Sequence, residues 1–432
     1  MRYQSPKQHS ELGKGRPSWF DYYAGYSSRF VAGLLPCLDL TANDVILDPW
    51  NGTGTTTSVA AGLGFTAIGF DANPAMSLVA KGRHVPAEDM ARAVSRLDAL
   101  LEAALANGDV GFSDGDPLRN WFTAETASLL RSFECQIQEQ LTECSQYRSV
   151  ATLHTIGNIP PKAAFFYTVA FRALRRLLRA FVGSNPTWMK TAKTPAQSTT
   201  VSPDQLRKLM TEEVSALASA LSQQLLPVWD SSKPAQVDVA SSTALPLNDM
   251  SVSAVITSPP YCTRIDYAMA TRAELAFLGY DEKAFRTLRE RLIGATVIAG
   301  ERPRPAREWG ETCLKFLRRM EQHTSKASAS YYLSTHLQYF SSIFASLREV
   351  DRALRGGGYC ILVVQDSYYK DLHNDLPSII LDMARGLRWR SIDTHDFQVT
   401  RTMARINTKA QRYAPHRSAV ESVLVFSKRH GE

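Results

Sequence analysis

Short apolar runs and helix-periodic segments alternate near the start of the chain. The run Val45-Ile46-Leu47 is followed by a glycine-containing turn and by a helix-like stretch over about 55–63. A second apolar run covers 66–70 and ends at Asp71. A strand, a helix and a second strand in this order form a right-handed parallel unit. The pattern therefore predicts the beginning of a doubly wound α/β sheet.

The same alternation returns in the second half of the chain. Strand-like apolar runs occur near Val237 and at Ala254-Val255-Ile256. Beyond them the spacing predicts, in order, a helix over 333–355 that stops at Gly356-Gly357-Gly358, a strand over 359–365, a helix over 375–387 and strands over 391–399 and 420–427. The predicted fold class is α/β, with one Rossmann-like sheet interrupted by helical insertions.

Two long segments and the N-terminus depart from this alternation. Apolar residues between roughly 87 and 225 recur at helical spacing with no strand pattern among them, which predicts a helical insertion over 87–235. The segment 275–330 is charged and predicts a second insertion. Residues 1–18 are polar and contain glycine and proline, which indicates a flexible arm. The parts that remain to form the sheet are 19–86, 236–274 and 331–432.

The charge of the chain is basic and unevenly distributed. Its 432 residues are 44% hydrophobic and carry a net charge of +7, which suits a folded protein with a polyanionic partner. Between Arg385 and His430, ten Lys or Arg stand against three acids. They are Arg385, Arg388, Arg390, Arg401, Arg405, Lys409, Arg412, Arg417, Lys428 and Arg429. This excess predicts a surface that faces phosphates. Four further arginines of one helical face, at 172, 175, 176 and 179, indicate either a solvated face or a phosphate-binding stripe.

The cysteine spacing predicts no metal site, and the chain shows no pattern typical of an exported protein. The six cysteines are scattered, with no C-x-x-C pair, so neither a zinc site nor a disulfide framework is expected. No run of about 18 uncharged apolar residues occurs, and the first residues lack a signal-like stretch. We expect a soluble protein of the reducing cytoplasm, with no metal and no membrane contact.

The first candidate motif is Asp48-Pro49-Trp50-Asn51-Gly52-Thr53-Gly54-Thr55, directly after a predicted strand. Its two glycines allow a tight turn and a close approach to a ligand, although a plain strand-to-helix turn has the same pattern. Asp71 ends the next strand 19 residues after Gly52, near the spacing of about 20 at which a carboxylate accepts both ribose hydroxyls. Position 57 is Thr57, where a dinucleotide site needs a third glycine. S-adenosylmethionine, a nucleoside without phosphate, is therefore the expected cofactor. The predicted cofactor-binding residues are Asp48, Gly52, Gly54, Thr55 and Asp71.

The second candidate motif is Thr257-Ser258-Pro259-Pro260-Tyr261, also after a predicted strand. Consecutive prolines restrict the backbone, so the Ser258 side chain and the Pro259 carbonyl are held in a preset direction. Two acceptors for the hydrogens of a base amine favour a tetrahedral nitrogen whose lone pair points at the methyl sulfonium. Tyr261 is expected to stack on a base extruded from the duplex. A proline-rich turn with a merely packed tyrosine is the alternative. The predicted catalytic residues are Ser258, Pro259, Pro260 and Tyr261.

With these motifs, about half of the chain resembles the amino DNA methyltransferases, the family that methylates cytosine N4 or adenine N6. The segments that carry the resemblance are 48–55, Phe70-Asp71-x-Asn73-Pro74 and 257–261, with 22–35, 352–358 and 421–426 in support. The resemblance implies a Rossmann-like, S-adenosylmethionine-dependent methyltransferase that flips a base out of double-stranded DNA. Segment 19–86 is then the cofactor-binding part, 236–274 the catalytic part, and 331–432 the C-terminal part. The insertion 87–235 is a candidate for target recognition.

The identity of the base follows from the resemblance alone. Ser258 stands where adenine-specific members often have Asp, and Ser241–Pro246 offers only hydroxyls where the family often has an acid. The missing acid argues against adenine-ring recognition by that segment, and in the family Ser-Pro-Pro-Tyr favours cytosine N4 over adenine N6. Cys262 lacks the setting of a cytosine-ring nucleophile, which disfavours carbon methylation. Two alternatives stay open: an RNA base methyltransferase with the same core, and a catalytically silent nucleic-acid-binding subunit. A cognate restriction or defence protein is a candidate partner.

Overall fold

The computed structural model describes residues 4–7, 15–22, 25–106, 115–143, 146–183, 188–221, 235–262, 265–298, 300–399 and 419–430. Seven strands of the described residues form one sheet in the order β3-β2-β1-β4-β5-β9-β8. These strands are β1 Val45–Asp48, β2 Thr66–Asp71, β3 Gln236–Val239, β4 Val252–Thr257, β5 Leu354–Gln365, β8 Arg390–Val399 and β9 Ala419–Ser427. The first five pair in parallel, whereas β9 runs antiparallel to both β5 and β8. A short hairpin pairs β6 Ser367–Tyr369 with β7 Leu372–Asn374.

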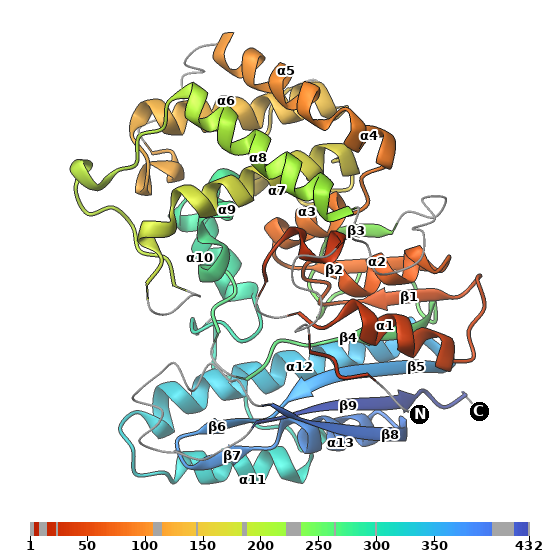
Figure 1. Cartoon of the computed structure of the whole chain (residues 1–432). Helices are drawn as coiled ribbons and strands as arrows, with labels where there is room; N and C mark the ends of the chain where they lie inside the picture. The colour runs from red at the N-terminus through yellow and green to blue at the C-terminus, as the bar shows by residue number, and fades with distance from the viewer. Residues whose placement is uncertain are drawn as a thin grey trace.

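Helices cover this sheet on both faces and extend beyond its β3 edge (Figure 1). They are α1 Ser28–Leu34, α2 Thr55–Gly62, α3 Pro74–Gly82, α4 Ala87–Ala91, α5 Ala93–Ala106, α6 Ala124–Leu141, α7 Pro161–Leu177, α8 Pro203–Leu221, α9 Arg272–Phe277, α10 Glu282–Arg291, α11 Gly310–Glu321, α12 Leu333–Ala353 and α13 Leu376–Gly386. A mainly parallel sheet with helices on both faces is the doubly wound architecture. The predicted Rossmann-like α/β class with helical insertions is confirmed.

Alternate residues of each central strand bury against opposite helix layers, because successive side chains of a strand point to opposite faces. Ile46 on β1 and Ile361 on β5 pack with the apolar residues of α1 and α2. Their neighbours Leu47 and Leu362 pack with those of α11, α12 and α13. Strands buried on both faces explain why these runs are continuously apolar rather than alternating.

The glycine run 356–358 has a different role from the predicted one. It does not end α12 as a cap, because β5 already begins at Leu354. Val252 pairs with Leu354 and Ala254 with Tyr359, so the glycines form a bulge between these two pairs. The left-handed φ of +76° at Gly357 explains why glycine is needed there.

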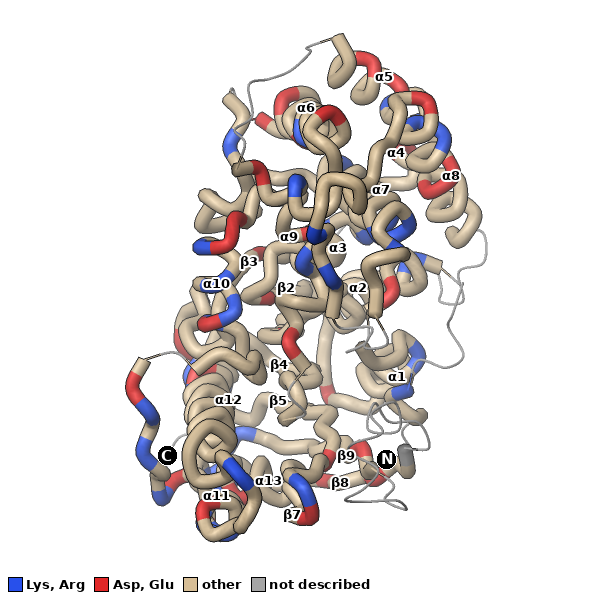
Figure 2. Tube along the Cα trace, turned by 90° about the vertical axis from the view of Figure 1, so that its left-hand side faces the viewer, with Lys and Arg blue, Asp and Glu red and all other residues tan. Residues whose placement is uncertain are grey.

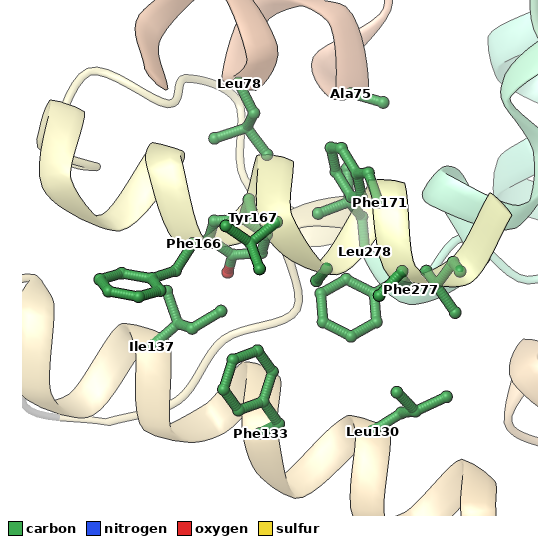
Figure 3. Close-up of a cluster of buried hydrophobic side chains, with 14 of the residues drawn as sticks. Ala75, Leu78, Leu130, Phe133, Ile137, Phe166, Tyr167, Phe171, Phe277 and Leu278 are labelled. Atoms are coloured by element: carbon green, nitrogen blue, oxygen red, sulfur yellow. The ribbon is translucent and has the colours of Figure 1, made fainter. Parts of the chain in front are cut away.

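A helical lobe built largely from α4 to α10 stands beside the β3 edge of the sheet (Figure 1). Its core is a large cluster of buried apolar residues, part of which Figure 3 shows around Phe171 and Phe277. The rings of these two residues meet edge to face at 6.1 Å. Helix α3 packs along α7, and a side chain at Gly82 would come within 2.9 Å of the Ala164 carbonyl oxygen. The lobe is therefore anchored to the sheet by this close helix pair.

Part of the predicted flexible arm packs against the lobe. Arg16 is 8% exposed, and its guanidinium donates to the Val85 carbonyl at 2.8 Å. The Gly15 amide donates to the Ala220 carbonyl at 2.9 Å. The expectation of a loose arm therefore does not hold for residues 15–18, because a polar composition does not reveal partners supplied by distant helices.

Candidate active site

The two predicted motifs lie side by side, although some 200 residues separate them in the sequence. Strands β1 and β4 are parallel neighbours at the centre of the sheet, so their carboxyl ends adjoin. The Thr257 hydroxyl at the end of β4 donates to Oδ1 of Asp48 at the end of β1. The structure therefore joins the glycine turn and the Ser-Pro-Pro-Tyr segment in one site, at the sheet edge where α/β proteins bind ligands.

Asp48 connects several elements within this site. Its side chain is 2% exposed, and besides Thr257 it accepts from the Tyr26 hydroxyl at 3.2 Å and the Trp50 amide at 3.1 Å. Burial raises the pKa of Asp48 to about 6, while these hydrogen bonds act in the opposite direction. The observed contacts of the carboxylate are all internal, so Asp48 connects β1 to β4 and to the segment before α1.

The glycine turn has the backbone that the sequence requires. Gly52 and Gly54 both have positive φ, at +49° and +81°. A Cβ at Gly54 would lie 2.7 Å from the Cβ of Ala80, so a larger residue would push the turn away from α3. Thr55 begins α2 directly after the turn and is buried. The amides at the start of α2 therefore lie next to the end of β1, an arrangement suited to a polar ligand.

Asp71 lies at the end of β2 and is bound to the same turn. One carboxylate oxygen accepts from the Gly52 amide at 2.8 Å, and the other accepts from the Asn73 amide at 2.8 Å. Burial raises the pKa of Asp71 to about 6 against these two hydrogen bonds. Because each oxygen keeps a further lone pair, the carboxylate can still accept from ligand hydroxyls.

A tyrosine that was not predicted as a site residue packs against the turn. The Tyr22 ring lies against Gly52, where a Cβ would be 3.4 Å from the nearest ring carbon. The centroid of the same ring is 6.4 Å from that of Tyr267. Burial and the nearby Asp71 carboxylate raise the pKa of Tyr22. Tyr22 falls in the supporting segment of the family resemblance, but nothing in its spacing predicts that its ring reaches the glycine turn.

The Ser-Pro-Pro-Tyr segment is fixed by contacts with three other strands and helices. The Ser258 hydroxyl donates to the Val363 carbonyl at 2.9 Å, which leaves the lone pairs of its oxygen free to act as acceptors. The carbonyl of Pro260 accepts from the Tyr339 hydroxyl at 2.8 Å. The Tyr261 hydroxyl donates to Glu421 Oε1 at 3.1 Å. Tyr339 and Glu421 were not predicted as site residues, because the contacts depend on how α12 and β9 pack.

Other candidate residues have internal partners. The arginine face on α7 is satisfied by acids of neighbouring helices: Arg172 and Arg176 bind Glu213, and Arg175 binds Glu274. Figure 2 shows basic and acidic residues interspersed along the helices of this lobe. Because these three arginines have carboxylate partners, the contacts favour the solvated face over the alternative of a phosphate-binding stripe.

The remaining candidates fall beside the site or outside the described residues. Asp266, which follows the Ser-Pro-Pro-Tyr segment, pairs with Arg289 of α10 at 2.6 Å. Five of the ten basic residues near the C-terminus lie outside the described residues, in the segment 400–418. Within the described ranges, no cluster of His, Cys, Asp or Glu could hold a metal ion. No helix in these ranges is long and apolar enough to cross a membrane.

The strand order, the reversed β9 and the two joined motifs define a Rossmann-like core that brings the predicted cofactor and catalytic segments together. The chain is 29% identical over 294 residues to the Type II methyltransferase M.BsoBI of Geobacillus stearothermophilus. The match covers 65% of this chain and 56% of that protein, so the chain spans little more than half the length of its relative. This similarity supports the resemblance to the amino DNA methyltransferases.

Two further comparisons do not identify a family or a fold for the chain. No protein-family model matches the chain. A solved structure of phosphoethanolamine N-methyltransferase 1 of Haemonchus contortus, in complex with phosphoethanolamine and S-adenosylhomocysteine, is 12% identical and covers 92% of this chain and 90% of its own. Its TM-score is 0.18, too low to support a conclusion about fold or function.

Proposed function

We propose that this chain is an S-adenosylmethionine-dependent DNA methyltransferase that modifies the exocyclic amine of a flipped base, with cytosine N4 preferred to adenine N6. The observation that carries the proposal is the junction of the two motifs through the Thr257–Asp48 hydrogen bond. The similarity to M.BsoBI, a Type II methyltransferase, supports the same activity and cofactor.

The glycine turn and Asp71 fit the proposed cofactor. The turn approaches its neighbours so closely that a Cβ at Gly54 is excluded, and the amides of α2 follow it. Asp71, already oriented by the Gly52 and Asn73 amides, accepts the ribose hydroxyls in this proposal. Asp48 and Thr55 complete the site by shaping the turn around the methionine end. When bound, S-adenosylmethionine supplies an electrophilic methyl group.

The Ser-Pro-Pro-Tyr segment orients the amine that receives the methyl group. The Ser258 oxygen and the Pro259 carbonyl accept the two hydrogens of the amine, which directs the nitrogen lone pair toward the methyl donor. Pro260 keeps the segment rigid, and its carbonyl is held by Tyr339. Tyr261 stacks on the extruded base. The preference for cytosine rests on Ser258, because both target amines offer the same two hydrogens.

The insertions are the proposed DNA-reading parts. In this proposal 87–235 recognises the target, and 275–330 approaches the flipped base. Two contacts support the second assignment: Arg289 of α10 pairs with Asp266, and Gly294 lies close to the backbone of Tyr261. We further propose that the chain acts on double-stranded DNA in the cytoplasm. Its proposed partner is a cognate restriction or defence protein.

Transfer of labelled methyl groups to DNA that lacks base modifications tests this function. We expect the purified chain to label duplex DNA but not tRNA, and nucleoside mass spectrometry to detect N4-methylcytosine. N6-methyladenine alone would overturn the cytosine preference and keep the mechanism. Labelled tRNA would favour an RNA enzyme, 5-methylcytosine would refute amine methylation, and cofactor binding without transfer would indicate a catalytically silent subunit.

A further inference from the structure

Glu421 is a buried carboxylate beside the catalytic segment that the proposed mechanism does not use. It lies near the start of β9, where it pairs with Gln365 of β5 and with Phe397 of β8. Glu421 is only 9% exposed. Glutamate is rarely buried unless its carboxylate is well paired. The position is therefore unusual enough to require a physical account.

The hydrogen bonds of this carboxylate are incomplete. Oε1 accepts from the Tyr261 hydroxyl at 3.1 Å, whereas Oε2 has no hydrogen-bond partner among the described residues. Burial raises the pKa of Glu421, while the hydrogen bond from Tyr261 and the charge of the nearby Lys7 act in the opposite direction. A buried acceptor without a partner destabilises the folded state. An apolar residue of similar volume would therefore suit this position better if folding were its only requirement.

Tyr261 has its hydroxyl between Glu421 and the catalytic serine. Its Oη lies 3.3 Å from Ser258 Oγ and donates to Glu421 on the other side. Ser258 is in turn fixed by its bond to the Val363 carbonyl. The tip of the Tyr261 ring is thus fixed to β9, and its backbone follows β4 in the chain. Strands β4 and β9 lie on either side of β5.

We propose that Glu421 is a positioning residue that holds the Tyr261 ring in the orientation needed to stack on the flipped base. This inference rests on the proposed function, in which Tyr261 contacts the base. Glu421 acts through its Oε1 acceptor and does not touch the substrate. Small errors in the placement of a stacking group lower the rate of transfer more than they lower duplex affinity, because phosphate contacts supply most of the affinity.

Three variants separate positioning from a structural role and from a role for the negative charge. Glu421→Met removes the acceptor at similar volume, and Glu421→Gln keeps an acceptor oxygen without the charge. Ser422→Ala is the matched control, because the neighbouring Ser422 is also buried and makes one side-chain bond, to Asp396 at 2.6 Å. We measure kcat, KM for DNA, S-adenosylmethionine affinity and the melting temperature.

We expect Glu421→Met to lower kcat by about 10- to 100-fold, with both affinities unchanged. Its melting temperature should stay the same or rise, because the buried oxygen without a partner is removed. The Tyr261 hydroxyl still has Ser258 Oγ as a hydrogen-bond partner in this variant. Glu421→Gln and Ser422→Ala should keep kcat within about threefold of the wild type. In a Tyr261→Phe background, Glu421→Met should have no further effect on kcat, since the hydroxyl that it holds is gone.

Several results would overturn the inference. A Glu421→Met protein with unchanged kcat, or with kcat and melting temperature both lowered, would leave Glu421 without a positioning role. A Glu421→Gln protein as slow as the Met variant would indicate a function for the charge. If the wild type transfers no methyl group, the proposed function fails first. In that case a crystal structure of Glu421→Met decides: an unmoved Tyr261 ring refutes the inference, and a displaced ring supports it.

Discussion

Replacing Asp71 tests the cofactor site most directly, because its two oxygens are oriented by the Gly52 and Asn73 amides, each at 2.8 Å. In the proposed complex the carboxylate accepts two ribose hydroxyls, and a hydrogen bond to a charged group contributes about 1.5–3 kcal/mol. Asp71→Asn keeps one acceptor oxygen and should therefore weaken S-adenosylmethionine binding by about 1.5–3 kcal/mol, roughly 10- to 100-fold. Asp71→Ala loses both bonds and should bind more weakly still.

The raised pKa of Asp71 also predicts that S-adenosylmethionine binding depends on pH. Because burial raises the pKa of Asp71 to about 6, its carboxylate is ionised above that pH and protonated below it. The ionised form accepts both hydroxyls, so affinity should be constant near pH 8 and fall as the pH drops through 6. At pH 5 only about one molecule in ten is ionised, which lowers the apparent affinity about tenfold. Asp71→Asn should lack this pH dependence.

Calorimetric titration with S-adenosylmethionine measures both effects. Asp238→Asn is the matched control: Asp238 lies on the adjacent strand β3, and its Oδ1 also accepts from two backbone amides, those of Ile156 and Val239, each at 2.7 Å. We expect the control to keep the wild-type affinity and pH profile. Unchanged affinity in Asp71→Asn would remove Asp71 from the cofactor site. An equal loss in Asp238→Asn would point to a general disturbance of the sheet edge.

Two further predictions concern the glycine turn and the basic C-terminal segment. Gly54→Ala should lower the free energy of unfolding by about 2–4 kcal/mol in denaturant titration, since it combines a positive φ with an approach of 2.7 Å to Ala80. Gly64→Ala has a similar φ and no atom within 4 Å, so it should cost only about 1 kcal/mol; equal losses would refute the close approach. Neutralising Arg401, Arg405 and Arg412 should flatten the log–log salt dependence of DNA binding by about 0.9 for each phosphate that these residues bind. An unchanged slope in filter binding would show that these charges do not touch DNA.

Periodicity in the sequence was sufficient to predict most of the sheet. The strand predicted over 66–70 and ending at Asp71, and the helix predicted over about 55–63, closely match β2 and α2. This succeeded because a strand covered on both faces must be apolar throughout, and a helix shows its buried side every three to four residues. The glycine run at 356–358 was misassigned, because a helix stop and a strand bulge both favour glycine.

Local motifs also indicated both halves of the candidate site, because glycine frees the backbone and proline restricts it wherever they occur. Only the tertiary structure decided that Asp48 and Thr257 meet, because their contact depends on β4 inserting beside β1. It also decided that the arginines of α7 pair with Glu213 and Glu274 rather than lying free for phosphate. Glu421 reaches Tyr261 for the same reason. Sequence patterns report the burial and backbone freedom of each residue, whereas these partners are set by strand order and helix packing.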